Sequence, residues 1–167
     1  MHNFHDLIFR GTYFTLNALT NLNRELLNNL QEGARTSDVK NLQMLQLQKV
    51  IMAVGMFSIF DSELQRNLSC DNGFRRAREI LKGKGEFELE IQFENYILAI
   101  NVLKHGKGKS YQNLLKKDYL PFEMVTPTST FYEEGDISEI DSLIKVDDLF
   151  VKNCANLISQ ISNSILT

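Results

Sequence analysis

The side chains best placed to do chemistry lie between residues 94 and 111, a stretch that reads ENYILAINVLKHGKGKSY. Its first part has the apolar spacing of a helix, and the polar residues come where that helix should end. Asn101 and His105 are four residues apart, so on a helix their side chains lie on one face, one turn from each other. We therefore expect an amide and an imidazole side by side at a helix end.

Three lysines and two glycines surround this pair. Gly106 comes directly after His105, and glycine is the residue expected just past a helix end, where the backbone adopts a positive φ. A second glycine, Gly108, allows the chain to fold back toward the helix. We therefore expect one polar site, called here the helix-end cluster, which consists of Asn101, Lys104, His105, Lys107 and Lys109.

Within the helix-end cluster we expect Asn101, His105 and Lys109 to line one groove, with Lys104 and Lys107 at its rim. Cationic side chains around such a groove suit a phosphate group, whether or not cleavage follows. The alternative is structural: His105 caps the last carbonyl groups of its helix, and Asn101 bonds to water or to a neighbouring helix. The residue types alone leave both interpretations open.

Length and composition fit one folded domain over residues 1–167. The net charge of −3 gives no overall basic field that would indicate a nucleic-acid partner. The charge is unevenly spread, however, because basic residues gather in 75–84 and 104–117, and acidic residues gather in 118–148. A positive middle segment of this kind can bind an anion locally.

Helical periodicity runs through the chain before Pro121, and both prolines, Pro121 and Pro127, lie in one region. This pattern predicts an all-α helical bundle with long central helices and a small irregular or β-containing insertion near 119–146. From 49 to 60 the apolar positions wrap nearly all round, which predicts a central helix buried by several neighbours. The expected helices are 3–30, 36–68, 74–82, one from EFELEIQF to His105, 111–117 with Ser110 as cap, and 147–166.

We expect no metal ion and no cofactor. Cys70 and Cys154 are far apart and form no CxxC pair, and His2 and His5 have no further ligand beside them. The tripeptide at 108–110, Gly-Lys-Ser, lacks the earlier glycine and the preceding strand of a phosphate-binding P-loop. These patterns exclude the common motif-based metal and nucleotide sites.

The N-terminus lacks the basic and apolar regions of a secretory signal. The longest mostly apolar run, 50–60, is shorter than the roughly 20 residues that a membrane span needs. We therefore expect a soluble, cytoplasmic protein with no membrane partner.

The sequence NVLKHGKGKSY, at the end of the apolar helix, resembles the HEPN superfamily, a group of helical-bundle proteins in defence and toxin systems. Many members carry an arginine, a polar residue that is often asparagine, three further residues and then a histidine. Asn101 and His105 match the polar residue and the histidine, whereas Ile100 occupies the arginine position, which is a departure. The resemblance covers residues 40–160, but its specific part is this short segment.

The resemblance implies a site chemistry. Active HEPN members are metal-independent endoribonucleases that work as dimers, with paired histidines as general acid and base and the arginine stabilising the phosphorane. By this resemblance His105 would be the acid or base at a dimer interface, and Asn101 would orient it or bind a phosphate oxygen. Lys104, Lys107 and Lys109 would replace part of the missing charge, although lysine lacks the planar fork of arginine.

Two functions follow from this resemblance. Because the arginine position is not filled, we favour a non-catalytic or degenerate RNA- or partner-binding module of a bacterial defence or toxin-type system, present as a homodimer. The alternative is an endoribonuclease that uses His105. An arginine from elsewhere beside His105, such as Arg75 or Arg76, would favour the enzyme, whereas a buried or fully hydrogen-bonded His105 away from any groove would favour the module.

Overall fold

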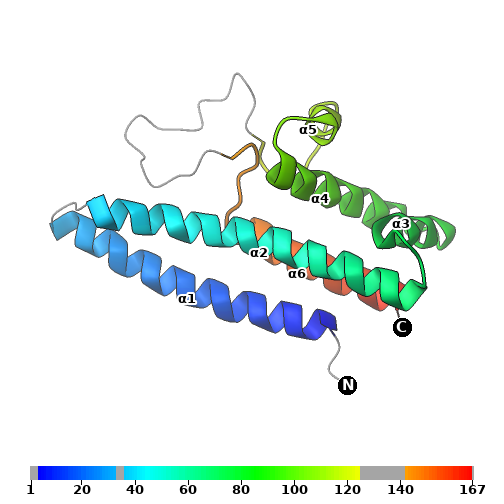
Figure 1. The fold of residues 1–167 in the computed structure, drawn as a ribbon, viewed down its shortest axis with the longest axis horizontal. Coiled ribbons are helices and arrows are strands. Elements are labelled where there is room, and N and C mark those ends of the chain that lie inside the picture. The colour runs from blue at the N-terminus through cyan, green and yellow to red at the C-terminus, as the bar shows by residue number, and fades with distance from the viewer. Residues whose placement is uncertain (1–3, 33–35, 125–141, 167) are drawn as a thin grey trace.

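The computed structural model describes residues 4–32, 36–124 and 142–166, and most of these residues are helical (Figure 1). No β-strand occurs among the described residues, so the predicted all-α fold is confirmed. The helices are α1 (Phe4–Glu32), α2 (Thr36–Leu68), α3 (Gly73–Gly83), α4 (Phe87–His105), α5 (Lys109–Leu114) and α6 (Asp148–Ile165).

The β content that we expected near 119–146 is not shown. Met124 and Ile144 form one isolated antiparallel bridge, which brings the two ends of that insertion together. Residues 125–141, which make up most of the expected insertion, lie outside the described residues.

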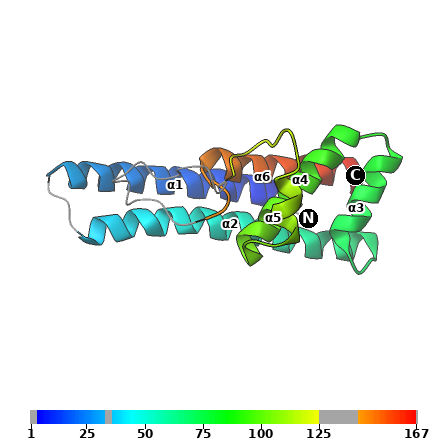
Figure 2. The ribbon, with the colours of Figure 1, turned by 90° about the horizontal axis from the view of Figure 1, so that it is seen from above.

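The long helices α1 and α2 form an antiparallel pair, and α6 lies along both of them (Figures 1 and 2). Helices α3 and α4 cover the C-terminal part of α2, and α5 folds onto α4. Helix α6 begins midway along the pair, where Asp148 contacts Thr20 and Lys49. Beyond that point the described part of the pair is a two-helix hairpin with a small core of its own, formed by Leu26, Leu42 and Leu45.

Aromatic side chains form the centre of the main core. Phe57 and Phe60 of α2 and Phe93 of α4 are fully buried, and their ring centroids lie 6.1–6.3 Å apart for the pairs Phe57–Phe93 and Phe60–Phe93. Phe74 of α3 meets Phe93 edge to face at 5.4 Å. Tyr96 continues the group toward α6. One connected group of rings therefore joins helices α2, α3, α4 and α6.

Helix α3 begins where a polar side chain of α2 meets it. The backbone N–H of Phe74 donates to Oδ1 of Asp61, and the N–H of Arg75 donates to the Asn72 side chain, which is the N-cap. Two of the free N–H groups at the helix start are thereby satisfied. Gly73 is buried at this point, and a Cβ there would lie 2.6 Å from the carbonyl oxygen of Asp61.

Helix α4 begins at Phe87, so the alternating segment EFELEIQF is helical, as predicted. Its alternation does not match one helix face, and the apolar residues consequently differ in burial. Phe87 and Ile91 are exposed, Leu89 is half-buried and Phe93 is buried. The later residues of α4, at helical spacing, fix the segment in the core.

The boundaries of α5 differ from our prediction. Gly108 is its N-cap in an extended conformation, and the helix covers Lys109–Leu114, so Ser110 is not the cap and the helix does not reach residue 117. Tyr111 and Leu114 are buried against the core. No side chain caps α5. Burial of these two side chains contributes more to stability than one cap would, and it holds this short helix on α4.

The predicted central helix α2 packs against several neighbours, but it is not covered on every side. Met44, Leu47, Ile51 and Ile59 are 44–55% exposed. Helices α1, α3, α4 and α6 cover the opposite side and leave this face open among the described residues. By length and composition alone α2 is also the one described helix that could cross a membrane, with a mean hydropathy of 1.3 over 18 residues, 28% of them buried.

The contact at Gly73 gives a test of the α2–α3 junction. We expect Gly73→Ala to destabilise the protein by about 1–3 kcal/mol, because the new methyl group would overlap Asp61 and Leu64. The matched control is Gly11→Ala, inside the first third of α1, where nothing lies within 4 Å of a new Cβ. That change should instead stabilise by up to about 1 kcal/mol. Urea unfolding measures both, and equal effects of the two changes would contradict the packing described here.

The two cysteines should differ in reactivity. Cys154 is fully buried, and burial raises the pKa of its thiol well above 9.0, whereas Cys70 is half-buried after α2. Because the thiolate is the reactive form, a thiol reagent should label one cysteine in the native protein and both in urea. Mass spectrometry of the labelled peptides identifies the site. Equally fast native labelling of both thiols would contradict the burial of Cys154.

Candidate functional site: the turn between α4 and α5

The helix-end cluster lies where α4 ends and the chain turns into α5. Helix α4 ends at His105, and Gly106 has a φ of 70°, as its position after the helix predicted. The N–H of Gly106 donates to the carbonyl oxygen of Val102 at 2.8 Å and closes the last turn of the helix. Asn101 and His105 therefore lie one helical turn apart at the exposed end of α4.

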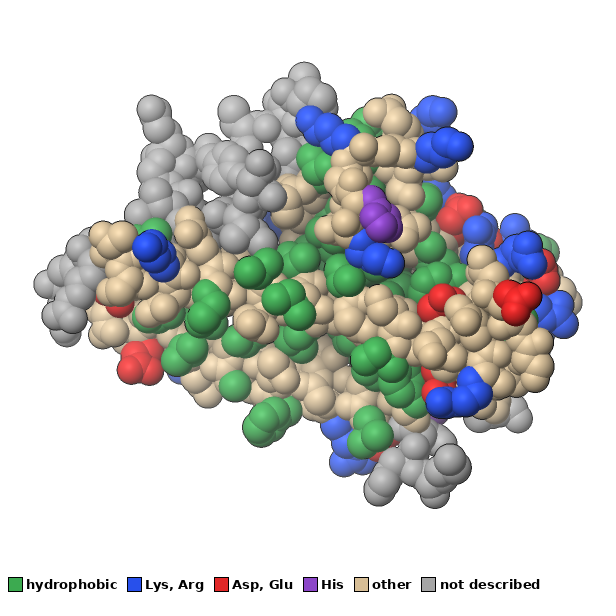
Figure 3. Space-filling view, viewed as in Figure 1, with side chains coloured by type: hydrophobic (Ala, Val, Ile, Leu, Met, Phe, Trp, Pro, Cys, Tyr) green, Lys and Arg blue, Asp and Glu red, His purple; other side chains and the backbone are tan. Residues whose placement is uncertain are grey.

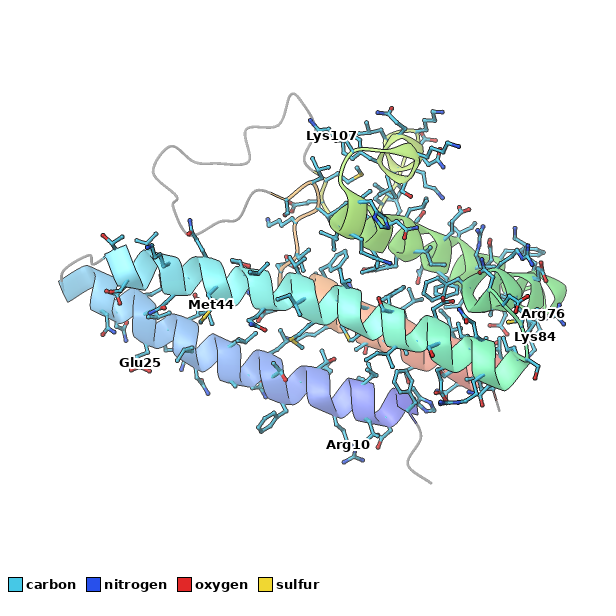
Figure 4. All side chains as sticks on the ribbon, viewed as in Figure 1. Arg10, Glu25, Met44, Arg76, Lys84 and Lys107 are labelled. Carbon is cyan, nitrogen blue, oxygen red and sulfur yellow. The ribbon has the colours of Figure 1, made fainter. Side chains whose placement is uncertain are left out.

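The side chains of the cluster differ in exposure. Asn101 is half-buried, whereas His105, Lys104, Lys107 and Lys109 are exposed. Figure 4 labels Lys107 at this turn, on the side of the molecule away from α1. Within the described part of the chain, these five side chains take part in no hydrogen bond or ion pair. The backbone of Gly106, and not the side chain of His105, closes the end of α4.

Cavities bounded by described residues lie elsewhere. One lies between α1, α2 and the start of α6, around Lys49 and Asp148. A second lies beside Tyr119 and Phe150, and a third beside Phe87 at the start of α4. The helix-end cluster lines none of these three, so the groove that we expected there stays a prediction.

Ion pairs hold the arginines of α3 away from the cluster. Arg76 and Arg78 contact Glu79 and Glu90, at 3.2 and 2.6 Å. Arg78 also reaches Glu94, which lies eleven residues before His105, about 16 Å along a helix. Figure 4 shows Arg76 and Lys107 at opposite ends of α4. The α3 arginines therefore do not lie beside His105, where the enzyme interpretation would need one.

Glu94 joins α4 to helix α3 and to the chain that follows α5. Its carboxylate accepts hydrogen bonds from Arg78 of α3 and from Lys117, which follows α5, each at 2.6 Å. Burial raises the pKa of Glu94 and is the largest single influence, but the Lys117 hydrogen bond and the charges of Arg78 and Lys117 together outweigh it. The pKa is consequently lowered from 4.5. The carboxylate fixes the chain after α5 onto α4 and so fixes the turn between them.

The sequence pattern does not identify Glu94 as a positioning residue. Glu90 and Glu94 are four residues apart, so their common face on α4 could be read from the sequence. Their partners, Arg78 and Lys117, are 16 and 23 residues away from Glu94, and no local pattern identifies them.

Comparisons with known proteins identify no relative of this chain. No family model matches this chain, and neither curated proteins nor solved structures give a significant match. The function of this chain is therefore inferred from the geometry of its described residues and from the resemblance of the short segment around His105.

The role of Glu94 can be tested by its pH dependence. Because its folded-state pKa is lowered, its contribution to stability is present above pH 4.5 and is lost as pH falls through the folded-state pKa. We expect Glu94→Gln to lower the free energy of unfolding by about 1 kcal/mol at neutral pH, since the carboxylate is only partly buried. The difference from the wild type should shrink as the pH falls below 4.5.

The control for this experiment is Glu88→Gln, because Glu88 is an exposed residue of the same helix. Its effect at neutral pH should be clearly smaller. Urea unfolding at several pH values checks both variants, and a difference between Glu94→Gln and the wild type that is constant across pH would contradict a charge-based role.

Proposed function

We propose that this protein is a non-catalytic RNA-binding module, and that the helix-end cluster contacts the phosphate backbone. The observation that carries the proposal is the unpaired positive charge of one turn. Lys104, Lys107 and Lys109 are exposed there with His105, and within the described residues none of them has an acidic partner. A phosphate can bind such cations without first displacing an ion pair.

The neighbourhood of His105 favours binding over cleavage. Cleavage through a phosphorane needs a precisely placed positive charge, and arginine supplies it best. Ile100 stands at the arginine position, and Arg76 and Arg78 are engaged near the other end of α4. His105 is nevertheless exposed, so an endoribonuclease that uses it as general acid or base, with Asn101 orienting it, is the alternative.

The cellular setting of the proposal comes from the same resemblance. HEPN-like proteins belong to bacterial defence and toxin-type systems, and we place this module among them, in the cytoplasm. Helix α2 has the length of a membrane span, but one side of it packs on α1, α3, α4 and α6. That packing is typical of the core helix of a soluble bundle.

RNA binding is tested with a triple variant, K104Q/K107Q/K109Q. We expect the wild type to bind single-stranded RNA with an affinity that falls as salt rises, and the triple variant to bind at least about tenfold more weakly with a smaller salt slope. Fluorescence anisotropy with a labelled RNA measures both quantities. The matched control is R75Q/R76Q, which removes exposed cations of α3 and should keep the affinity of the wild type.

Equal losses in the two variants would show a non-specific effect of net charge and would contradict the assigned site. Wild-type protein that does not bind RNA at low salt would contradict RNA binding altogether and leave a protein partner as the remaining interpretation.

Catalysis is tested separately with the same RNA in the presence of a chelator. We expect no cleavage by the wild type and none by His105→Ala. Circular dichroism should show the same helix content for both proteins, since His105 is exposed. Cleavage by the wild type that His105→Ala abolishes would establish the endoribonuclease instead.

A further inference from the structure

The outer side of α5 continues the cationic surface of the helix-end cluster. Its exposed residues recur at spacings of three and four, and we call them the α5 face: Lys109, Gln112, Asn113 and Lys116. Neither lysine takes part in an ion pair within the described residues. Figure 3 shows Lys and Arg side chains over α5, at the top of the molecule. The α5 face is therefore hydrophilic, with a lysine at each end.

An exposed aromatic ring follows the α5 face in the chain. Tyr119 is 80% exposed, and three peptide units separate it from the last lysine of that face, so their Cα atoms are at most about 11 Å apart. The chain is fixed on both sides of the ring. Lys117 donates to Glu94 at 2.6 Å, and the ring of Phe122 lies 5.3 Å from that of Tyr96. A ring on a segment held at both ends loses little conformational entropy when a ligand binds.

A cavity of about 300 Å³ lies beside Tyr119. Two further rings line it, those of Phe122 and Phe150, which meet edge to face at 5.5 Å. The volume is at the lower end of the range for small-molecule sites, and aromatic side chains are typical walls of such sites. A space of this kind suits one planar aromatic group, which can stack on the exposed ring.

The charged residues that line this cavity are mainly acidic. Glu123 pairs with Lys145 at 3.1 Å, and the exposed Asp147 accepts the N–H of Phe150 through Oδ1. A phosphate group would meet net negative charge here, which disfavours binding of an RNA backbone inside the cavity. Carboxylate oxygens can instead accept hydrogen bonds from the amino groups of bases. The α5 face and the cavity therefore suit different parts of one nucleotide chain.

We propose that the cavity beside Tyr119 binds one unstacked base of a single-stranded RNA, with the ring of Tyr119 stacked on that base, while the α5 face contacts phosphates of the same strand. This inference rests on the proposed RNA-binding function and names the form of RNA that the site takes. Bases of a single strand are free to stack on an aromatic side chain, whereas those of a duplex already stack on each other.

The distances agree with one short strand. From Lys109 to Lys116 the coil extends about 10 Å at 1.5 Å per residue, and Tyr119 lies at most about 11 Å further. About six stacked nucleotides at 3.4 Å each span this whole distance. That length is within the range that single-strand sites of other proteins cover.

The test compares two equally exposed rings. Tyr119 is 80% exposed and Phe14 of α1 is 78% exposed, and Phe14 lines none of the three cavities described above. With a labelled single strand of about 12 nucleotides, we expect Tyr119→Ala to bind about tenfold more weakly, because one base–ring stack is lost. Tyr119→Phe keeps the ring and should bind like the wild type, as should Phe14→Ala. Fluorescence anisotropy measures the affinities, and circular dichroism should show unchanged helix content in all three variants.

Salt dependence separates stacking from phosphate contact. Tyr119→Ala should keep the salt slope of the wild type, because it removes no cation. Lys116→Gln, on the α5 face, should lower that slope by about 1, as expected for one lost phosphate contact. A duplex of the same sequence should bind Tyr119→Ala and the wild type equally, since its bases stay stacked.

Several outcomes would overturn the proposal: wild-type affinity in Tyr119→Ala, an equal loss in Phe14→Ala, an equal loss in Tyr119→Phe, or an equal loss with the duplex. An unchanged salt slope in Lys116→Gln would refute the phosphate contact of the α5 face. Wild-type protein that binds no RNA at low salt would refute the RNA-binding function itself. Binding that needs the lysines of the helix-end cluster but not Tyr119 would refute only the base site, so the two failures are distinguishable.

Discussion

The structure depends on the burial of Phe57 of α2 against rings of two other helices, α3 and α4. Its ring is fully buried, and it meets Phe74 of α3 at 6.0 Å and Phe93 and Tyr96 of α4 at 6.3 and 6.4 Å. Burial of one phenylalanine contributes about 2–3 kcal/mol, and contacts between rings add to this. Because these four rings come from three helices, their packing decides how α3 and α4 sit on α2.

The position of the helix-end cluster depends on that packing indirectly, through the placement of helix α4. Phe93 and Tyr96 hold the middle of α4 in the core, which directs its last turn, with Asn101 and His105, out of the bundle. Glu94 lies between those two rings in sequence, yet it points to Arg78 and Lys117 instead. One helix therefore uses its apolar side for anchoring and its acidic side to hold the following turn. The cations of the turn are exposed and have no acidic partner among the described residues.

Most helices could be predicted from sequence because local signals mark their ends. Asp147 caps α6 through its hydrogen bond from Phe150, and Gly106 ends α4 with a positive φ. Both depend on residue types within a few positions of the helix end. Our predicted boundaries of α5 were wrong because the position of this helix depends on burial of Tyr111 and Leu114 against distant residues. No local sequence signal indicates that burial.

The site was predictable only in its local part. The i,i+4 relation of Asn101 and His105 follows from helix geometry alone, and the structure has it. A groove, in contrast, needs a second wall from elsewhere in the chain, and the sequence holds no information on which segment would supply it. The same limit applied to the arginines of α3, whose partners on α4 became visible only when the two helices were packed together.

Helix α2 shows how one sequence pattern can have two physical causes. Apolar residues all round a helix predict burial on every side, and that inference requires only that something cover each face. It does not say whether the cover comes from the same chain. Within the described residues, the same chain covers the side that holds Phe57 and Phe60 and leaves Ile51 and Ile59 open. The periodicity therefore predicts that α2 is a central helix, but it does not predict which of its sides the same chain covers.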